Sequence, residues 1–157
     1  MIKLRTLCLL ALATLIISCD NDLVYDKTLE VNENAWHRSE VLEFEVDIED
    51  SLRLYNIAIN LRNTIDYPYS NTYLFVKTIY PDGSITRRDT VECVLAYPDG
   101  SWTGRGGRRI RDNRFWFTEP IVFPLKGRYR FEIEQGNKDT IIQGIKNVGL
   151  HIEYRKH

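Results

Sequence analysis

Residues 42–48 read Leu-Glu-Phe-Glu-Val-Asp-Ile, and this short stretch decides the fold. Its four apolar residues alternate with three acidic ones. Successive side chains of a β-strand point to opposite faces of the sheet. The alternation therefore predicts a strand that buries one face in a core and exposes the other face to water.

The same two-residue period recurs along the rest of the chain. Residues 55–61, 129–133 and 148–154 alternate in this way, and residues 73–79 are apolar on both faces, as in a central strand. A further strand is expected at 85–96, shorter ones at 115–118 and 121–123, and a single helical turn at 140–143. The tetrapeptide Pro-Asp-Gly-Ser, which is typical of a tight turn, occurs at 81–84 and again at 98–101.

About eight strands, with turn signals every 8 to 12 residues or so, are typical of a β-sandwich. We therefore predict an all-β fold, an antiparallel β-sandwich of jelly-roll type over residues 35–157. The composition agrees, because a chain that is 43% apolar and 27% charged is neither disordered nor a protein with many membrane spans.

The N-terminus has a different character from the rest of the chain. Lys3 and Arg5 precede an apolar run from Leu7 to Ile17, which is too short to cross a bilayer as a helix. The run ends in Ile-Ile-Ser-Cys at residues 16–19, the pattern of a bacterial lipobox. We predict that residues 1–18 are a signal peptide and that Cys19 becomes the acylated N-terminus, because two or three acyl chains hold a protein stably on a membrane.

Cleavage at this site changes the net charge of the chain and the number of its cysteines. It removes two of the 21 basic residues and none of the 22 acidic ones, so the mature chain is mildly acidic, which argues against a nucleic-acid partner. Cys93 is then the one free thiol, and we expect it to be a small buried side chain in a strand. Residues 19–34 are acidic, rich in asparagine and without periodicity, so they are predicted to be a tether.

The first candidate contact region is the polar stretch between two predicted strands, residues 61–71. Its tyrosines offer rigid apolar surface with a polar tip, and its asparagine and aspartate side chains can bond to nearby backbone. It is therefore either a loop that satisfies its own backbone or a contact patch for another envelope protein or a glycan. The candidate residues are Arg62, Asn63, Asp66, Tyr67, Tyr69 and Asn71.

The second candidate region is a stretch rich in glycine and arginine. Five arginines lie within ten residues, at positions 105, 108, 109, 111 and 114. Arginine pairs bidentately with carboxylate or phosphate, so the stretch is either a solvated loop or a site for an acidic protein or a lipopolysaccharide phosphate. The candidate residues here are Trp102, Arg105, Arg108 and Arg109.

No catalytic arrangement is evident in the sequence. The three histidines, His37, His151 and His157, are not at metal-ligand spacing, and no Gly-x-Ser-x-Gly motif occurs. His151 is expected to be a surface residue of the closing strand. We predict no enzyme activity, no catalytic residue, no metal and no cofactor, although no single set of loop carboxylates decides the question of calcium.

Several motifs along the chain resemble one known family. They are the lipobox, Trp36, residues 61–71 (Leu-Arg-Asn-Thr-Ile-Asp-Tyr-Pro-Tyr-Ser-Asn), Arg88-Asp-Thr90, Leu95-Ala96, Gly100-Ser-Trp-Thr-Gly104, Gly127-Arg-Tyr129 and residues 144–149. In this order they are similar to the gliding motility lipoprotein GldH family of the Bacteroidetes. The resemblance implies an accessory envelope lipoprotein that supports gliding and the associated type IX secretion machinery, with other envelope lipoproteins as partners and no catalytic residues.

A second function is also open from the sequence. A β-sandwich with three tryptophans and nine tyrosines could be a carbohydrate-binding module, provided that its aromatic rings share one exposed face. Trp36 and Trp116 are expected in the core, and Trp102 in a loop. Either function places the chain in the cell envelope, anchored to a membrane, at the outer membrane or its periplasmic face, with the leaflet open.

Overall fold

The computed structural model describes residues 22–86, 88–116 and 119–156. The predicted signal peptide and Cys19 lie outside these residues. The described chain forms ten strands and one short 3-10 helix: β1 (Leu23–Glu30), η2 (Asn32–Asn34), β2 (Ala35–His37), β3 (Leu42–Ile48), β4 (Tyr55–Thr64), β5 (Asn71–Ile79), β6 (Asp89–Val94), β7 (Ile110–Trp116), β8 (Gly127–Gln135), β9 (Ile141–Gln143) and β10 (Ile145–Tyr154). In this part of the chain, no helix has the length and apolar character needed to cross a bilayer.

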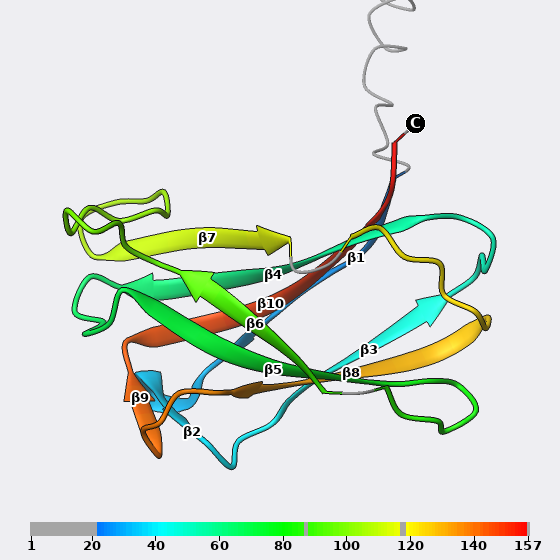
Figure 1. Cartoon of the computed structure of the whole chain (residues 1–157), viewed down its shortest axis with the longest axis horizontal. Coiled ribbons are helices and arrows are strands. Elements are labelled where there is room, and N and C mark those ends of the chain that lie inside the picture. Colours follow the sequence, from blue (N-terminus) through cyan, green and yellow to red (C-terminus); the bar gives the residue numbers. More distant parts are fainter. Residues whose placement is uncertain (1–21, 87, 117–118, 157) are drawn as a thin grey trace, which may run out of the picture.

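Two four-stranded antiparallel sheets form the two layers of the sandwich (Figure 1). The β1 sheet has the order β1-β10-β4-β7, and the β3 sheet has the order β3-β8-β5-β6. Strands β2 and β9 form a small separate pair. Among the other eight strands, the first pairs with the last, the second with the seventh, the third with the sixth and the fourth with the fifth. This is the jelly-roll topology, so the predicted fold is confirmed.

The core lies between the two sheets and is built as the alternation predicts. Every second residue of β3, from Leu42 to Ile48, is buried, and the acidic residues between them are exposed. Ile57 and Ile59 of β4 and Phe131 of β8 join the same cluster. Burying each such side chain contributes about 1.5–3 kcal/mol, which is how the two-residue period holds the layers together.

The main difference from the sequence-based expectation is at the N-terminal side. Instead of a tether over residues 19–34, residues 23–30 form β1, which pairs with β10 from Leu23 opposite Glu153 to Glu30 opposite Asn147. Val31 is then buried in the core. The strand shows no regular apolar alternation because it lies at a sheet edge: the backbone ladder to β10 pairs it, and Val24, Tyr25 and Leu29 pack only partly against the core. The tether prediction is therefore wrong from Leu23 onward.

The structure also shows the outcome for the expected helical turn and for the two Pro-Asp-Gly-Ser turns. Residues 141–143, within the expected helical turn, form β9, in which Ile142 is buried opposite the fully buried Trp36 of β2. The two Pro-Asp-Gly-Ser segments form the same turn, as predicted: Ser84 and Ser101 each donate backbone and hydroxyl hydrogen bonds to the aspartate two residues earlier. The second turn places Trp102 opposite Ala96, where its ring packs partly against the core.

Candidate interaction surface

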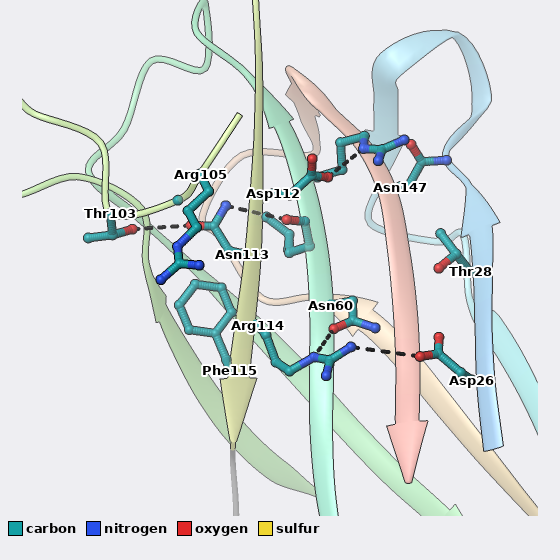
Figure 2. Close-up of a pocket in the computed structure, with 13 residues that line it drawn as sticks. Asp26, Thr28, Asn60, Thr103, Arg105, Asp112, Asn113, Arg114, Phe115 and Asn147 are labelled. Carbon is teal, nitrogen blue, oxygen red and sulfur yellow. Dashed lines mark hydrogen bonds and ion pairs between the residues drawn. The ribbon is translucent and has the colours of Figure 1, made fainter. Parts of the chain in front are cut away.

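An open hollow of about 730 Å³ lies on the outer face of the β1 sheet (Figure 2). Its lining comes from all four strands of that sheet and from the chain segment 103–105 beside β7. The lining residues are Asp26, Thr28, Asn60, Leu61, Arg62, Thr103, Gly104, Arg105, Asp112, Asn113, Arg114, Phe115 and Asn147.

The floor of the hollow is polar because alternate side chains of a strand point to opposite faces of the sheet. On β4, Ile59 and Leu61 face the core, so Asn60 and Arg62 face outward. Their cross-strand partners on β7 are Arg114 and Asp112 respectively. Opposite charges and polar groups therefore face each other across neighbouring strands, which is the arrangement that stabilises a solvent-facing sheet surface.

Cross-strand contacts fix these groups in place. Arg62 Nε lies 2.6 Å from Asp112 Oδ1, and Arg114 Nε donates to Asn60 Oδ1 at 2.7 Å. Arg114 Nη2 is also 3.7 Å from Asp26 Oδ2 on β1 (Figure 2). Such half-exposed pairs contribute at most about 1 kcal/mol each, but they neutralise one another and orient the side chains.

A partly buried network of amide and hydroxyl side chains positions the segment that bears Arg105. Asn113 donates to Asn63 Oδ1 at 3.0 Å, and the Thr103 hydroxyl donates to Asn113 Oδ1 at 3.2 Å. Arg105 and Asp112 exchange two backbone hydrogen bonds of 3.0 and 2.7 Å. The segment 103–105 is thereby fastened to β7 at the edge of the hollow.

The arginine loop, residues 106–109, connects Arg105 to the start of β7 at Ile110. Gly106 has a φ of 148°, and a Cβ there would collide with the carbonyl oxygen of Ile110, so the turn requires glycine. Arg111 and Arg114 belong to β7 and not to a loop, which differs from the expectation of one solvated stretch. Arg108 and Arg109 are exposed in the loop itself.

Arg105 differs from the other two arginines of the hollow. Its side chain is exposed, and no described residue hydrogen-bonds or ion-pairs with its guanidinium, whereas Arg62 and Arg114 both face carboxylates. The hollow therefore combines two neutralised pairs with one unmatched positive charge. This arrangement suits an acidic ligand group, which would find a fork of donors already at the rim.

The candidate residues of the polar stretch divide into buried and exposed ones. Asn63 and Tyr67 are buried: the Tyr67 hydroxyl donates to the carbonyl of Asn71 at 3.1 Å and accepts from Asn137 at 3.0 Å. Burial raises the pKa of Tyr67 above its ordinary value. Tyr67 thus bonds to the backbone of its own stretch, whereas Asn63 belongs to β4 and bonds to Asn113 on β7.

Asp66 and Tyr69 remain exposed beside this network. The Tyr69 hydroxyl donates to Asp139, and this hydrogen bond raises the pKa of Tyr69. The backbone of Ile65 bonds to the carbonyl of Arg109 at 3.1 Å, so the polar stretch and the arginine loop meet. Among the predicted residues, the structure brings Arg62 and Arg105 together in the hollow.

The tryptophans do not share one exposed face. Trp36 is fully buried, as expected, and Trp102 is half-buried against the core. The expectation that Trp116 lies in the core is wrong, because it ends an edge strand and is 50% exposed, with its ring edge-on to His151. Phe115 is the one aromatic residue lining the hollow in the described chain. This arrangement gives little surface on which a sugar ring could stack.

His151 was expected at the surface, but it is buried. Its Nδ1 is 2.7 Å from Asp26 Oδ2, and its Nε2 is 3.2 Å from Glu153 Oε2. Sequence reasoning also missed Asp26, Asp112 and Arg114 as neighbours, because the sheet order that gathers them is not readable from one strand. Within the described ranges, no group of three or more histidine, cysteine or acidic side chains could hold a metal ion.

Fold and surface together define a jelly-roll domain with a polar, arginine-bearing hollow on one sheet face. The sequence pattern of the family described as GldH lipoprotein matches residues 23–152, which is most of the chain. The chain belongs to this GldH lipoprotein family. It is therefore a membrane-anchored protein of the cell envelope.

Two GldH proteins are similar to this chain over most of its length. The chain is 36% identical over 143 residues to a gliding motility lipoprotein GldH homolog of Christiangramia forsetii, covering 87% of this chain and 86% of that protein. It is 34% identical over 154 residues to gliding motility lipoprotein GldH of Flavobacterium johnsoniae, covering 94% of each.

Similarity to solved structures is distant. A chain of infectious bursal disease virus, Gx strain, matches 85% of this chain with 15% identity and a TM-score of 0.35. Dimeric latent PorU from Porphyromonas gingivalis matches 88% with 8% identity and a TM-score of 0.36. This chain spans 30% and 14% of those two chains, and nothing about its function follows from either.

Proposed function

We propose that this chain is a non-enzymatic accessory lipoprotein that supports gliding motility and the associated type IX secretion machinery. In this proposal Cys19 carries the lipid anchor, and the hollow of the β1 sheet binds an acidic segment of another envelope protein. Support for the apparatus comes from the family and from the names of the two relatives. Support for the contact comes from the chemistry of the hollow.

The unmatched charge of Arg105 is the observation that carries the proposal. The mature chain has more acidic than basic residues, yet the exposed cations of this region, Arg105, Arg108 and Arg109, have no ionic partner among the described residues. A carboxylate-rich segment would complete the charge balance of the hollow without displacing the pairs on its floor. Such charge matching steers association and selects partners.

A protein ligand suits the hollow better than a glycan does. Apart from Phe115 and Leu61, its described lining consists of charged, amide, hydroxyl and small side chains, so a flat stacking platform is missing. Side-chain amides of Asn60 and Asn147 and the hydroxyls of Thr28 and Thr103 can instead meet an extended peptide. A crosslink to glycan in place of protein would contradict this choice.

Photo-crosslinking in cells tests the contact directly. A photoreactive amino acid is placed at Thr28, which lines the hollow on the edge strand β1, and a matched one at Glu43, which is exposed on the edge strand β3. We expect Thr28 to crosslink an identifiable envelope protein at an acidic segment, and Glu43 not to do so. Adding Arg105→Glu to the variant that carries the photoreactive amino acid at position 28 should lower the crosslink yield at least about tenfold. The substituted carboxylate would then face the acidic segment of the partner and repel it.

Salt provides a second readout for the same experiment. At about 1 M salt the Debye length is only about 3 Å, so a contact driven by Arg105 should weaken strongly. The proposal fails if the product at Thr28 is equally abundant at Glu43, or if neither Arg105→Glu nor salt changes its yield.

A further inference from the structure

The N-terminal end of the described chain is fastened to one end of the sandwich. The carbonyl of Asp22 accepts a 2.7 Å hydrogen bond from the backbone of Tyr154, and its carboxylate lies 3.1 Å from Lys156 Nζ. Three residue steps separate Asp22 from Cys19. An extended chain advances at most about 3.3–3.6 Å per residue, so an acyl group on Cys19 is attached within about 10 Å of this end.

The loop between β3 and β4, residues 49–54, lies at the same end (Figure 1). The backbone of Arg155 donates to the carbonyl of Leu54 at 2.9 Å, which joins this loop to the C-terminal segment. Leu52 is 88% exposed, more than any other large apolar side chain in the described chain, and Leu54 is 41% exposed. Leu52 and Leu54 together form a small exposed apolar patch at this end of the chain, and such patches rimmed by polar residues mark protein or membrane contacts.

The loop holds Leu52 outward by specific hydrogen bonds. The backbone N–H of Leu52 donates to Asp50 Oδ1 at 2.8 Å, and the hydroxyl of the buried Tyr55 donates to the carbonyl of Asp50. These bonds engage Oδ1 of Asp50 with the loop backbone and its carbonyl with the start of β4. The exposure of Leu52 is therefore part of the folded conformation.

Basic side chains surround the exposed leucines. An open hollow of about 410 Å³ is lined by Leu52, Arg53, Leu54, Arg155 and Lys156. The Arg53 guanidinium lies 3.6 Å from the centre of the Tyr154 ring. The acidic groups nearby are Asp22, which faces Lys156, Asp50, which is bonded within the loop, and Glu49. Leucine, tyrosine and snorkelling cations together are the set that proteins place at a membrane–water interface.

We propose that this end of the sandwich rests on the bilayer that holds the acyl chains of Cys19, with Leu52 inserted among the headgroups and Arg53 and Arg155 at the lipid phosphates. This orientation goes beyond the proposed function, and it requires acylation of Cys19. Strands β10 and β4 would then carry the far end of the domain, with the arginine loop, away from the membrane. The hollow of the β1 sheet would stay open to a protein partner.

The test uses the full acylated chain reconstituted in vesicles of phosphatidylethanolamine and phosphatidylglycerol. Leu52→Cys is labelled with an environment-sensitive fluorophore, and Ile141→Cys, 49% exposed on β9 at the opposite end, is the matched control. Acylated Cys19 has no free thiol, and Cys93 is buried, which raises the pKa of its thiol to about 12 and keeps it unlabelled. Quenching by a nitroxide on the lipid headgroup reports contact with the bilayer.

We expect quenching at position 52 to exceed that at position 141 several-fold. Equal quenching at the two positions, or stronger quenching at 141, would overturn the orientation. Flotation of the vesicles measures membrane attachment independently of the quenching. A chain that fails to float with the vesicles contradicts both the acylation of Cys19 and the orientation. Neither outcome depends on which protein occupies the hollow, so the proposed function is tested separately.

Discussion

Asp26 on β1 lies directly opposite His151 on β10, with 2.7 Å between Oδ2 and Nδ1. Glu153 approaches the other ring nitrogen at 3.2 Å, and the imidazole is buried between the two carboxylates. Strand β1 is the strand that leads from the predicted anchor into the domain. This contact therefore fastens the N-terminal edge strand to the rest of its sheet.

His151→Ala should destabilise the domain because it removes the imidazole that joins Asp26 and Glu153. We expect a loss of about 1–3 kcal/mol in the free energy of unfolding, measured by urea denaturation. Lys27→Ala, an exposed change on the same strand, is the control and should change it by no more than about 0.5 kcal/mol. Equal effects of the two substitutions would show that the His151 contact does not hold β1.

Tyr67→Phe tests the interpretation of the polar stretch as a structural loop. The substitution removes a hydroxyl that bonds to Asn71 and Asn137 and leaves the Asn137 amide with one partner fewer. We expect a loss of about 1–2 kcal/mol in the free energy of unfolding. Tyr69→Phe at the exposed neighbour should cost less than about 0.5 kcal/mol, and the reverse order would contradict the assignment.

Cys93 should be unreactive in the folded protein. Burial raises the pKa of its thiol from an ordinary value of 9.0 to about 12, and the thiolate is the reactive form. A thiol reagent at pH 8 should therefore label Cys93 only after unfolding. Rapid labelling of the native chain at that pH, at the rate of a free thiol, would contradict the burial of Cys93.

The same pKa makes a prediction about alkaline stability. Below pH 9 the thiol is protonated in both states, and above it only the unfolded state ionises, so stability falls between about pH 9 and pH 12. The contribution is at most about 1.4 kcal/mol per pH unit. Cys93→Ala should lose less stability over this range than the native chain does, and identical pH profiles would contradict the prediction.

The layers of the sandwich were predictable because burial imposes a two-residue period on the sequence. Residues 42–48 show this most clearly, and every second side chain there is buried. Strand β1 was missed because an edge strand held by its backbone ladder needs no apolar alternation. Residues 141–143 were too few for a period to separate a strand from a helical turn.

The hollow was predictable only in part. Arg62 and Arg105 stand out by residue type, but Asp26, Asp112 and Arg114 become neighbours only through the order β1-β10-β4-β7. The burial of Tyr67 and His151 follows from the same long-range packing. A single sequence without its sheet order contains no signal for these contacts.

Charge reversal at Arg105 tests the central claim most directly. Cells whose own copy carries Arg105→Glu are compared with cells carrying Lys138→Glu, an exposed lysine between β8 and β9 outside the hollow, at matched protein levels. The measurement is the amount of type IX cargo released into the medium. We predict release close to that of a deletion strain for Arg105→Glu and normal release for Lys138→Glu. Normal release from the Arg105→Glu cells would contradict the claim that this hollow is where the chain contacts its partner.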